Sequence, residues 1–136
     1  RTLHAISEGT HWNTRMTEHT APDSLEALRD AQRAFVAERD WERFHTPKNL
    51  AAALAIEAAE LLEPFQWLTA EESSRLSPQQ LAAVRDEMAD VLLYLVRLAD
   101  RLDVDLLAAA RDKIRKNALK YPVERSKGSA RKYDEL

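Results

Sequence analysis

Apolar residues recur at helical spacing along most of the chain, and in two stretches acidic residues interrupt or flank the apolar pattern. In the first stretch, residues 49–67, leucines define one apolar stripe. At about 100° per residue, Glu57 projects into the middle of this stripe and Glu60 lies one turn further on at its edge, whereas Glu63 falls on the opposite face. The leucines of the stripe are Leu50, Leu54 and Leu61. A carboxylate inside such a stripe is unusual and requires an explanation.

The second stretch, residues 85–102, repeats this arrangement. Glu87, Asp90 and Tyr94 line the flank of an apolar stripe at positions i, i+3 and i+7, which lie close together on a helix. The stripe, which we expect to face the core, consists of Val84, Met88, Val91, Leu95, Leu98 and Leu102. Two helices therefore each carry an acidic pair beside an apolar seam.

If the two helices pack on these seams, the carboxylates of Glu57, Glu60, Glu87 and Asp90 converge. Like charges at short distance raise one another's pKa and oppose folding unless a cation lies between them. Hard oxygen ligands without Cys or a suitably placed His favour Mg²⁺ or Mn²⁺ over zinc or copper. The spacing therefore predicts a Mg²⁺ site that could hold the phosphates of a nucleotide and activate water. The alternative is that these are ordinary solvated charges.

The remaining pattern predicts four helices in an antiparallel bundle, or in a dimerising half of one. The first should begin at a capping box formed by Asp23 and Glu26 and end near Asp40. The second should begin at Thr46, where Pro47 occupies the first helical position, and end near Glu63 before Pro64.

A polar loop is expected over residues 69–76, followed by a third helix. This helix should begin at a second capping box, Ser77 with Gln80, and reach about Leu102. Asp103 is expected to cap a fourth helix, which Pro122 stops.

The domain organisation follows from these elements. Residues 1–22 are expected to be a disordered leader, of which residues 1–15 are not native because Met16 is a natural start. Residues 23–121 form the helical domain, and residues 122–136 form a basic, extended tail.

Composition limits the class of protein. The 136 residues suit one domain, and the abundance of Ala, Leu, Glu and Arg with only 2 Gly suits an all-α fold. The net charge of −3 argues against a nucleic-acid or membrane binder, and no apolar run is long enough to span a bilayer. The absence of Cys fits a reducing compartment, so a cytoplasmic location is expected.

Two further sets of residues could bind a substrate. Aromatic residues near both ends of the acidic first stretch could stack on a nucleobase, although such residues also serve as core residues. Polar residues along one side of the fourth helix could contact phosphate oxygens, although a solvated helix end is the commoner case. The first set is Trp41, Phe44, His45 and Trp67, and the second is Lys113, Asn117, Lys120 and Tyr121. Arg131, Lys132 and Tyr133 in the tail could fold over the same site.

Other chemistries have weaker support. Glu42 with His45, and Glu8 with His11, match the Glu-x-x-His spacing of di-iron proteins, but the first lies just before a proline and the second in the leader. No Gly-rich phosphate loop and no serine or cysteine nucleophile motif is present.

The combined motifs resemble a known family. Glu57–Trp67 (EAAELLEPFQW) and Asp86–Ala99 (DEMADVLLYLVRLA) resemble the all-α nucleoside triphosphate pyrophosphohydrolases of the MazG-like superfamily. Residues 38–50 (ERDWERFHTPKNL) and the tail (KYPVERSKGSARKYDEL) look most like its dCTP pyrophosphatase branch. The resemblance covers about Ser24 to Leu136.

The resemblance implies Mg²⁺-dependent attack of water on dCTP or a 5-modified dCTP, giving dCMP and pyrophosphate and so sanitising the nucleotide pool. It implies that Glu57, Glu60, Glu87 and Asp90 hold the metal. The nucleoside would contact residues 41–45, Trp67 and Tyr94, and the phosphates would lie near the polar set on the fourth helix. It also implies a homo-oligomer, a dimer or a dimer of dimers, with sites between subunits.

The sequence departs from the branch at two positions. Pro64 interrupts a helix that the branch continues, and Gln32 stands where the branch has a His that contacts the nucleotide. We therefore expect a dCTP pyrophosphohydrolase, with Gln32 in the substrate site. The alternatives are a broader MazG-like hydrolase, one that cleaves phosphoribosyl-ATP, or a non-catalytic helical interaction module.

Overall fold

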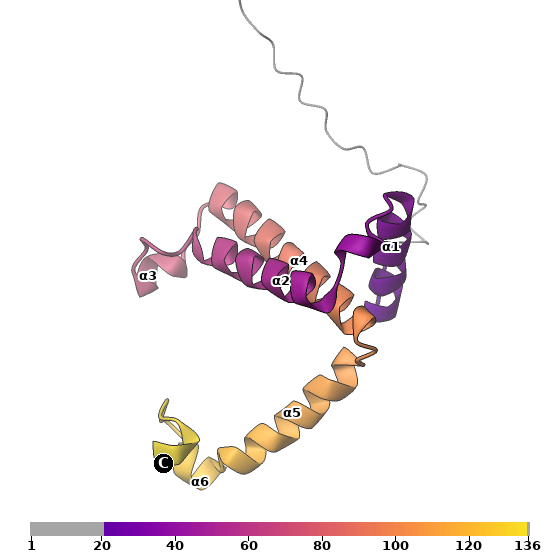
Figure 1. Cartoon of the computed structure of the whole chain (residues 1–136). Coiled ribbons are helices and arrows are strands. Elements are labelled where there is room, and N and C mark those ends of the chain that lie inside the picture. Colours follow the sequence, from indigo (N-terminus) through magenta and orange to yellow (C-terminus); the bar gives the residue numbers. More distant parts are fainter. Residues whose placement is uncertain (1–20, 136) are drawn as a thin grey trace, which may run out of the picture.

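The computed structural model describes residues 21–135, and throughout this range the regular structure is helical (Figure 1). The predicted all-α fold is confirmed. In chain order the elements are α1 (Leu25–Glu38), the 3₁₀ turn η2 (Glu42–Phe44), α2 (Pro47–Leu62), α3 (Ala70–Ser73), α4 (Pro78–Arg101), α5 (Leu106–Lys120), α6 (Val123–Ser126) and the 3₁₀ turn η3 (Tyr133–Glu135). The predicted leader lies outside the described residues, apart from Ala21 and Pro22.

The centre of the fold is the antiparallel pair α2 and α4, with α1 packed across the C-terminal half of α4 (Figure 1). Leu50 of α2 is buried, exposing only 1% of its surface. A side-chain hydrogen bond also links α1 to α4, since Gln32 Nε2 donates to the carbonyl oxygen of Leu93 at 2.9 Å. The other buried apolar residues of the described chain are Val36, Val84, Val96 and Ala99. The core thus lies where three helices meet.

The helix starts follow the predicted capping chemistry at two positions. The Thr46 hydroxyl accepts from the backbone N–H of Asn49, with Pro47 directly after the cap. Ser77 and Gln80 form both hydrogen bonds of a capping box at the start of α4. The prediction was wrong by one residue at α1, where Ser24 rather than Asp23 is the cap.

Two aspartates take a left-handed conformation at helix C-termini. Asp40 (φ 52°) follows α1, and Asp103 (φ 54°) follows α4. In both cases the next residue donates its N–H back into the helix, from Trp41 to Val36 O at 3.1 Å and from Val104 to Ala99 O at 2.9 Å. These are Schellman motifs, in which Asp is tolerated because its short side chain suits this backbone region. The prediction that Asp103 caps α5 was wrong, and Asp105 is the cap.

Two segments predicted to lack regular structure contain short helices. The loop over residues 69–76 includes α3, whose cap Thr69 forms a reciprocal capping box with Glu72. The tail, predicted to be extended, contains α6 and η3. Tyr133 turns back onto the end of α5, where its ring packs edge-on against Tyr121 with centroids 6.1 Å apart. Local capping and aromatic contacts order both segments.

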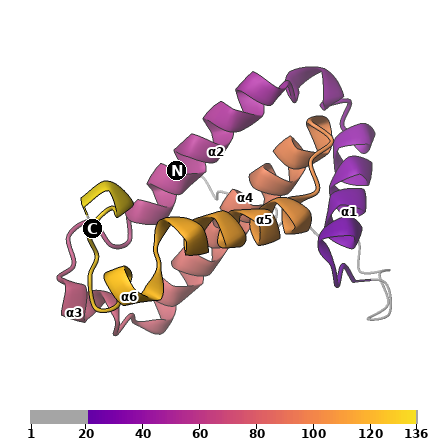
Figure 2. The same ribbon diagram turned by 90° about the horizontal axis from the view of Figure 1, so that it is seen from below.

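The predicted apolar stripe of α4 is covered along one of its edges. Val84 is buried, and Val91 and Leu98 are partly buried. Met88 (57% exposed), Leu95 (38%) and Leu102 (53%) remain open, so the predicted core stripe is only half covered within the chain. Helix α5 leaves the end of α4 and runs apart from the α2 and α4 pair (Figure 1), and seen from below it passes in front of α4 (Figure 2). The fourth helix therefore does not close a bundle with the other three inside one chain.

Within residues 21–135, none of the helices has the length and apolarity that crossing a membrane requires.

Candidate metal centre

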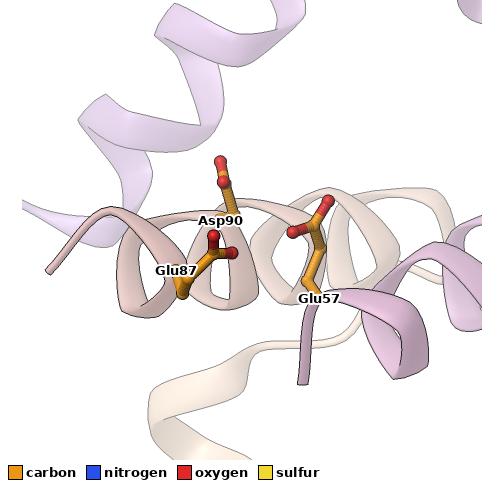
Figure 3. A group of neighbouring side chains, drawn as sticks. All are labelled: Glu57, Glu87 and Asp90. Carbon is orange, nitrogen blue, oxygen red and sulfur yellow. The ribbon is translucent and has the colours of Figure 1, made fainter. Parts of the chain in front are cut away.

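Three carboxylates from two helices meet on the α2 and α4 pair. Glu57 projects from the middle of α2 towards Glu87 and Asp90 on α4 (Figure 3). One oxygen of each carboxylate lies within 4.8 Å of the others. Glu87 and Asp90 share a face because they are three residues apart on one helix, and the antiparallel packing brings Glu57 opposite them. The convergence predicted from spacing is found for these three residues.

The site encloses one oxygen of Glu57 and one of Glu87 without giving either a hydrogen-bond donor. Among the described residues, Glu57 Oε2 and Glu87 Oε2 are inaccessible to solvent and have no hydrogen-bond partner. A buried polar atom without a partner costs free energy unless a ligand satisfies it. Hard, negatively charged oxygens of this kind are the donors that divalent cations such as Mg²⁺ prefer. The residues therefore fit a metal ion.

The electrostatics of the site favour bound protons or cations. Desolvation by burial, a hydrogen bond with Glu60 and the charges of Glu60, Asp90 and Glu87 raise the pKa of Glu57 to about 7. Burial and the charges of Glu60 and Asp90 also raise the pKa of Glu87. Glu57 and Glu87 are thus harder to ionise in the site than in water, because burial and the neighbouring negative charges outweigh the hydrogen bond by which Glu57 lowers the pKa of Glu87. A cation between them would relieve this repulsion.

Glu60, the fourth predicted ligand, lies beside the group of three. It is partly buried on α2, and its hydrogen bond with Glu57 is one cause of the raised pKa of Glu57. It does not belong to the set of oxygens within 4.8 Å. Glu63 is exposed, as its position on the opposite face of the helix predicted. The site therefore consists of three convergent carboxylates with Glu60 next to them.

Tyr94 lies close to these acids, one turn beyond Asp90 on α4. Its hydroxyl is partly desolvated, and burial together with the charges of Glu57, Asp90 and Glu60 raises its pKa. The structure thus places Tyr94 near the carboxylates, as its spacing from Glu87 and Asp90 predicted.

Comparison with known proteins now identifies the fold. Residues 52–136, which include the whole acidic site, match the MazG-like family. This chain belongs to the MazG-like family.

Individual relatives of this MazG-like chain are similar over most of its length. It is 48% identical over 115 residues to dCTP pyrophosphatase 1 of Bos taurus and 47% identical to dCTP pyrophosphatase 1 of Homo sapiens. Both alignments cover 83% of this chain and 68% of the relative. The crystal structure of a pyrophosphatase from Archaeoglobus fulgidus superposes with a TM-score of 0.69 and 42% identity, over 72% of this chain and 92% of that one.

The predicted aromatic set lies at both ends of α2. Trp41 packs edge-on against Phe35 with ring centroids 5.8 Å apart, and its centroid is 6.5 Å from that of His45. Phe44 is 56% exposed on η2. Trp67, on the turn that follows Pro64, is 87% exposed. Trp41 and His45 are thus held next to each other, whereas Trp67 makes little contact within the chain.

The side-chain amide of Gln32 forms a hydrogen bond through its nitrogen but not through its oxygen. Its amide nitrogen donates to Leu93 O on α4, while Oε1 is enclosed and has no partner among the described residues. Gln32 thus contributes to the packing of α1 on α4 and keeps a free acceptor.

The predicted phosphate-binding residues Lys113, Asn117, Lys120 and Tyr121 all lie on or directly after α5. No hydrogen bond or ion pair joins them to the acidic site in the described part of the chain, and α5 runs apart from α2 and α4 (Figure 1). Lys120 and Tyr121 instead contact the ring of Tyr133, with Lys120 Nζ 4.9 Å from its centroid. Within one chain, this set and the carboxylates remain separate.

Sequence reasoning missed a buried arginine. Arg97 of α4 exposes only 3% of its surface and binds His45, Glu42 and Asp100. The available signal was its position between the apolar Val96 and Leu98, with Asp100 three residues later. Because α4 packs against both α1 and α2, that position faces a neighbour rather than solvent.

Proposed function

We propose that this chain is a Mg²⁺-dependent pyrophosphohydrolase that converts dCTP, or a 5-modified dCTP, and water to dCMP and pyrophosphate. The observation that carries the proposal is the group formed by Glu57, Glu87 and Asp90, with enclosed oxygens that lack donors. This group lies in a chain 48% identical to a protein named dCTP pyrophosphatase 1.

In this proposal the carboxylates of Glu57, Glu87 and Asp90 would hold Mg²⁺, with Glu60 alongside. The bound ion would supply positive charge to the phosphate oxygens and would lower the pKa of water. Water adds to the α-phosphorus, the bond to the oxygen bridging the α- and β-phosphates breaks, and pyrophosphate leaves. Glu60, which hydrogen-bonds Glu57 but is not among the three convergent ligands, is available to accept the proton from the attacking water.

The other predicted residues supply recognition. Trp41 and His45 form a paired aromatic surface, suited to the nucleoside, and His45 contacts Arg97 of α4, two turns beyond Asp90. Tyr94 lies on α4 between Asp90 and Arg97. Phe44, Gln32 and Trp67 complete the nucleoside side, and the polar set on α5 complements the phosphates.

We also propose that the working form is a homo-oligomer, a dimer or a tetramer. Large apolar side chains are exposed on α2, α4 and α5, and exposed apolar residues in such number are typical of subunit interfaces. They include Ile56, Leu62, Met88, Leu92, Ile114 and Leu119, which are 42% to 82% exposed. A second subunit would cover the open face of α4, and its α5 could bring Lys113 and Asn117 to the acids.

The experiment that tests the proposed reaction is product analysis with a panel of dNTPs, NTPs and phosphoribosyl-ATP, with Mg²⁺ or with chelator. We expect dCMP and pyrophosphate, with dCTP the best substrate and no turnover in chelator. If the protein hydrolyses phosphoribosyl-ATP best, or many nucleotides equally well, the proposed substrate dCTP would be replaced by that compound or that range of nucleotides. Survival of every nucleotide at saturating Mg²⁺ would overturn the enzymatic proposal in favour of an interaction module.

A further inference from the structure

All three guanidinium nitrogens of Arg97 donate a hydrogen bond. Its Nε donates to His45 Nδ1 at 3.2 Å, Nη1 donates to Asp100 Oδ2 at 3.1 Å and Nη2 donates to Glu42 Oε2 at 2.7 Å. Only 3% of the residue is exposed. These contacts tie α4 to η2 and to the residue that precedes the cap of α2.

Arg97, His45, Asp100 and Glu42 form the arginine network. Each of its two acids, Asp100 and Glu42, also contacts a second arginine. Asp100 also accepts two hydrogen bonds from Arg33 of α1, and Glu42 lies 3.4 Å from Arg101 Nη1. Arg33 and Arg101 could therefore neutralise the two carboxylates without Arg97. The hydrogen bond to His45 Nδ1, in contrast, comes from Arg97 alone among the described residues.

The contact fixes the protonation state of His45. An arginine Nε can only donate, so Nδ1 of His45 must accept and the ring proton resides on Nε2. The backbone at this point is also held, since His45 N donates to Glu42 O at 3.1 Å and Asn49 Nδ2 donates to Phe44 O at 3.0 Å. The backbone of His45 is thus fixed by hydrogen bonds, and its imidazole is fixed by the buried guanidinium of Arg97.

The surroundings of His45 also favour the neutral imidazole on balance. Desolvation by burial and the positive charge of Arg97 lower the pKa of His45, and Arg101 adds to this. Glu42 opposes the change but does not reverse it. The imidazole is therefore a neutral donor at neutral pH, and its proton lies on Nε2.

The position of the network relates it to the acidic site. Arg97 lies seven residues, or about 10 Å along the helix axis, beyond Asp90 on α4. A nucleotide whose phosphates lie at the carboxylates would place its sugar or base, rather than its phosphates, near His45.

We infer that Arg97 is a positioning residue that holds His45 as a neutral imidazole with its proton on Nε2, so that Nε2 donates a hydrogen bond to an uncharged acceptor in the nucleoside part of the substrate. The role in substrate binding rests on the proposed function, whereas the state of the imidazole does not.

The first test measures the imidazole directly. Long-range ¹⁵N–¹H NMR on the whole protein reports which ring nitrogen carries the proton, and a His45→Gln variant assigns the signal among the 4 histidines. We expect the Nε2–H tautomer and a His45 pKa below that of an ordinary histidine. A proton on Nδ1 in the unmodified protein would overturn the inference, whatever the behaviour of any variant.

The second test separates positioning from structure. Arg97→Met removes the guanidinium but leaves Arg33 on Asp100 and Arg101 on Glu42. We expect a mixture of His45 tautomers, a higher His45 pKa, and a KM for dCTP raised about tenfold with kcat changed less than about twofold. Arg101→Met is the matched control. Arg101 lies on the same helix and contacts the same acid, Glu42, but it makes no hydrogen bond to His45. This variant should leave both the tautomer and KM unchanged.

The outcomes distinguish this inference from the proposed function. An unchanged KM in Arg97→Met, or equal effects in Arg101→Met, would contradict the role of Arg97 in substrate binding. If the unmodified protein does not turn over dCTP, the proposed function fails, and the NMR measurement alone decides the state of His45.

Discussion

Glu57 of α2 and Glu87 of α4 face each other across the helix pair, and each has one enclosed oxygen without a hydrogen-bond partner in the described chain (Figure 3). Two helices that pack well by their apolar residues thus bring together charges that repel. Such an arrangement stabilises the fold only when something else binds there, which links the stability of this protein to its ligand.

Replacing either facing glutamate by the neutral amide should remove activity without loss of the fold. In Glu57→Gln or Glu87→Gln we expect kcat to fall on the order of 100-fold or more, because the metal loses a charged ligand. The metal-free melting temperature should be equal or higher, since one repelling charge is gone. Glu63→Gln, an exposed change on the turn after α2, is the control and should retain full activity. Comparable loss in the control would remove the special role of the facing pair.

The stability of the metal-free protein should depend on pH in a defined direction. The pKa of Glu57 is about 7 in the folded chain against an ordinary 4.5, so between these values the folded state binds a proton that the unfolded state has lost. The contribution of Glu57 to stability is therefore full below about pH 4.5 and is lost as the pH rises towards 7. Saturating Mg²⁺ should reduce the fall.

The lowered pKa of His45 acts in the opposite direction, because an unfolded chain then binds the extra proton. The informative quantity is therefore the difference in melting temperature between the unmodified protein and Glu57→Gln in chelator, measured from pH 5 to pH 8. This difference should become more negative as the pH rises. A difference that does not vary with pH would show that Glu57 titrates normally.

Asp100 should be the acid on which the arginine network depends most. Its side chain is 9% exposed, and hydrogen bonds from Arg33 lower its pKa. We expect Asp100→Asn to reduce the free energy of unfolding by about 3 kcal/mol, because charge is removed beside the buried Arg97. Asp30→Asn, which removes an exposed acid 3.6 Å from the same Arg33, should cost under about 0.5 kcal/mol. Urea unfolding at a fixed protein concentration measures both, and equal losses would contradict the expectation.

The two tryptophans at the ends of α2 should respond differently to truncation. Trp67 is 87% exposed, so Trp67→Ala should change stability by less than about 0.5 kcal/mol and raise KM for dCTP if the nucleotide contacts the ring. Trp41 packs on Phe35, so Trp41→Ala should raise KM and also cost about 1 kcal/mol of stability. Steady-state kinetics and urea unfolding on both variants provide the measurement. An unchanged KM would remove that tryptophan from the substrate site.

The open face of α4 should be an oligomer interface. Leu92→Glu places a charge among the exposed apolar residues of this helix, where Leu92 is 42% exposed, and should shift the protein towards monomer in sedimentation velocity. Gln79→Glu, in the exposed first turn of the same helix, should leave the assembly unchanged. A monomeric unmodified protein at all concentrations would exclude the proposed assembly.

Much of this molecule follows from sequence because its signals are local. The 3.6-residue period, the capping chemistry of Thr46 and Ser77 and the break at Pro64 each act within one or two helical turns, and all three are found where predicted. The same holds for the acidic pairs, since a spacing of three residues fixes which side chains share a helix face. Long-range packing was needed only to bring Glu57 opposite Glu87 and Asp90.

The tertiary structure alone decided the contacts between elements that are distant in sequence. Three features depend on how whole helices pack: the burial of Arg97 against His45 and Asp100, the partial covering of the apolar stripe of α4, and the path of α5 away from the other helices. Spacing cannot distinguish an apolar face that a neighbour covers from one that remains open, because both have the same period. The sequence therefore determined the helices and the acids that each presents, whereas packing decided which faces are covered and which charged groups meet.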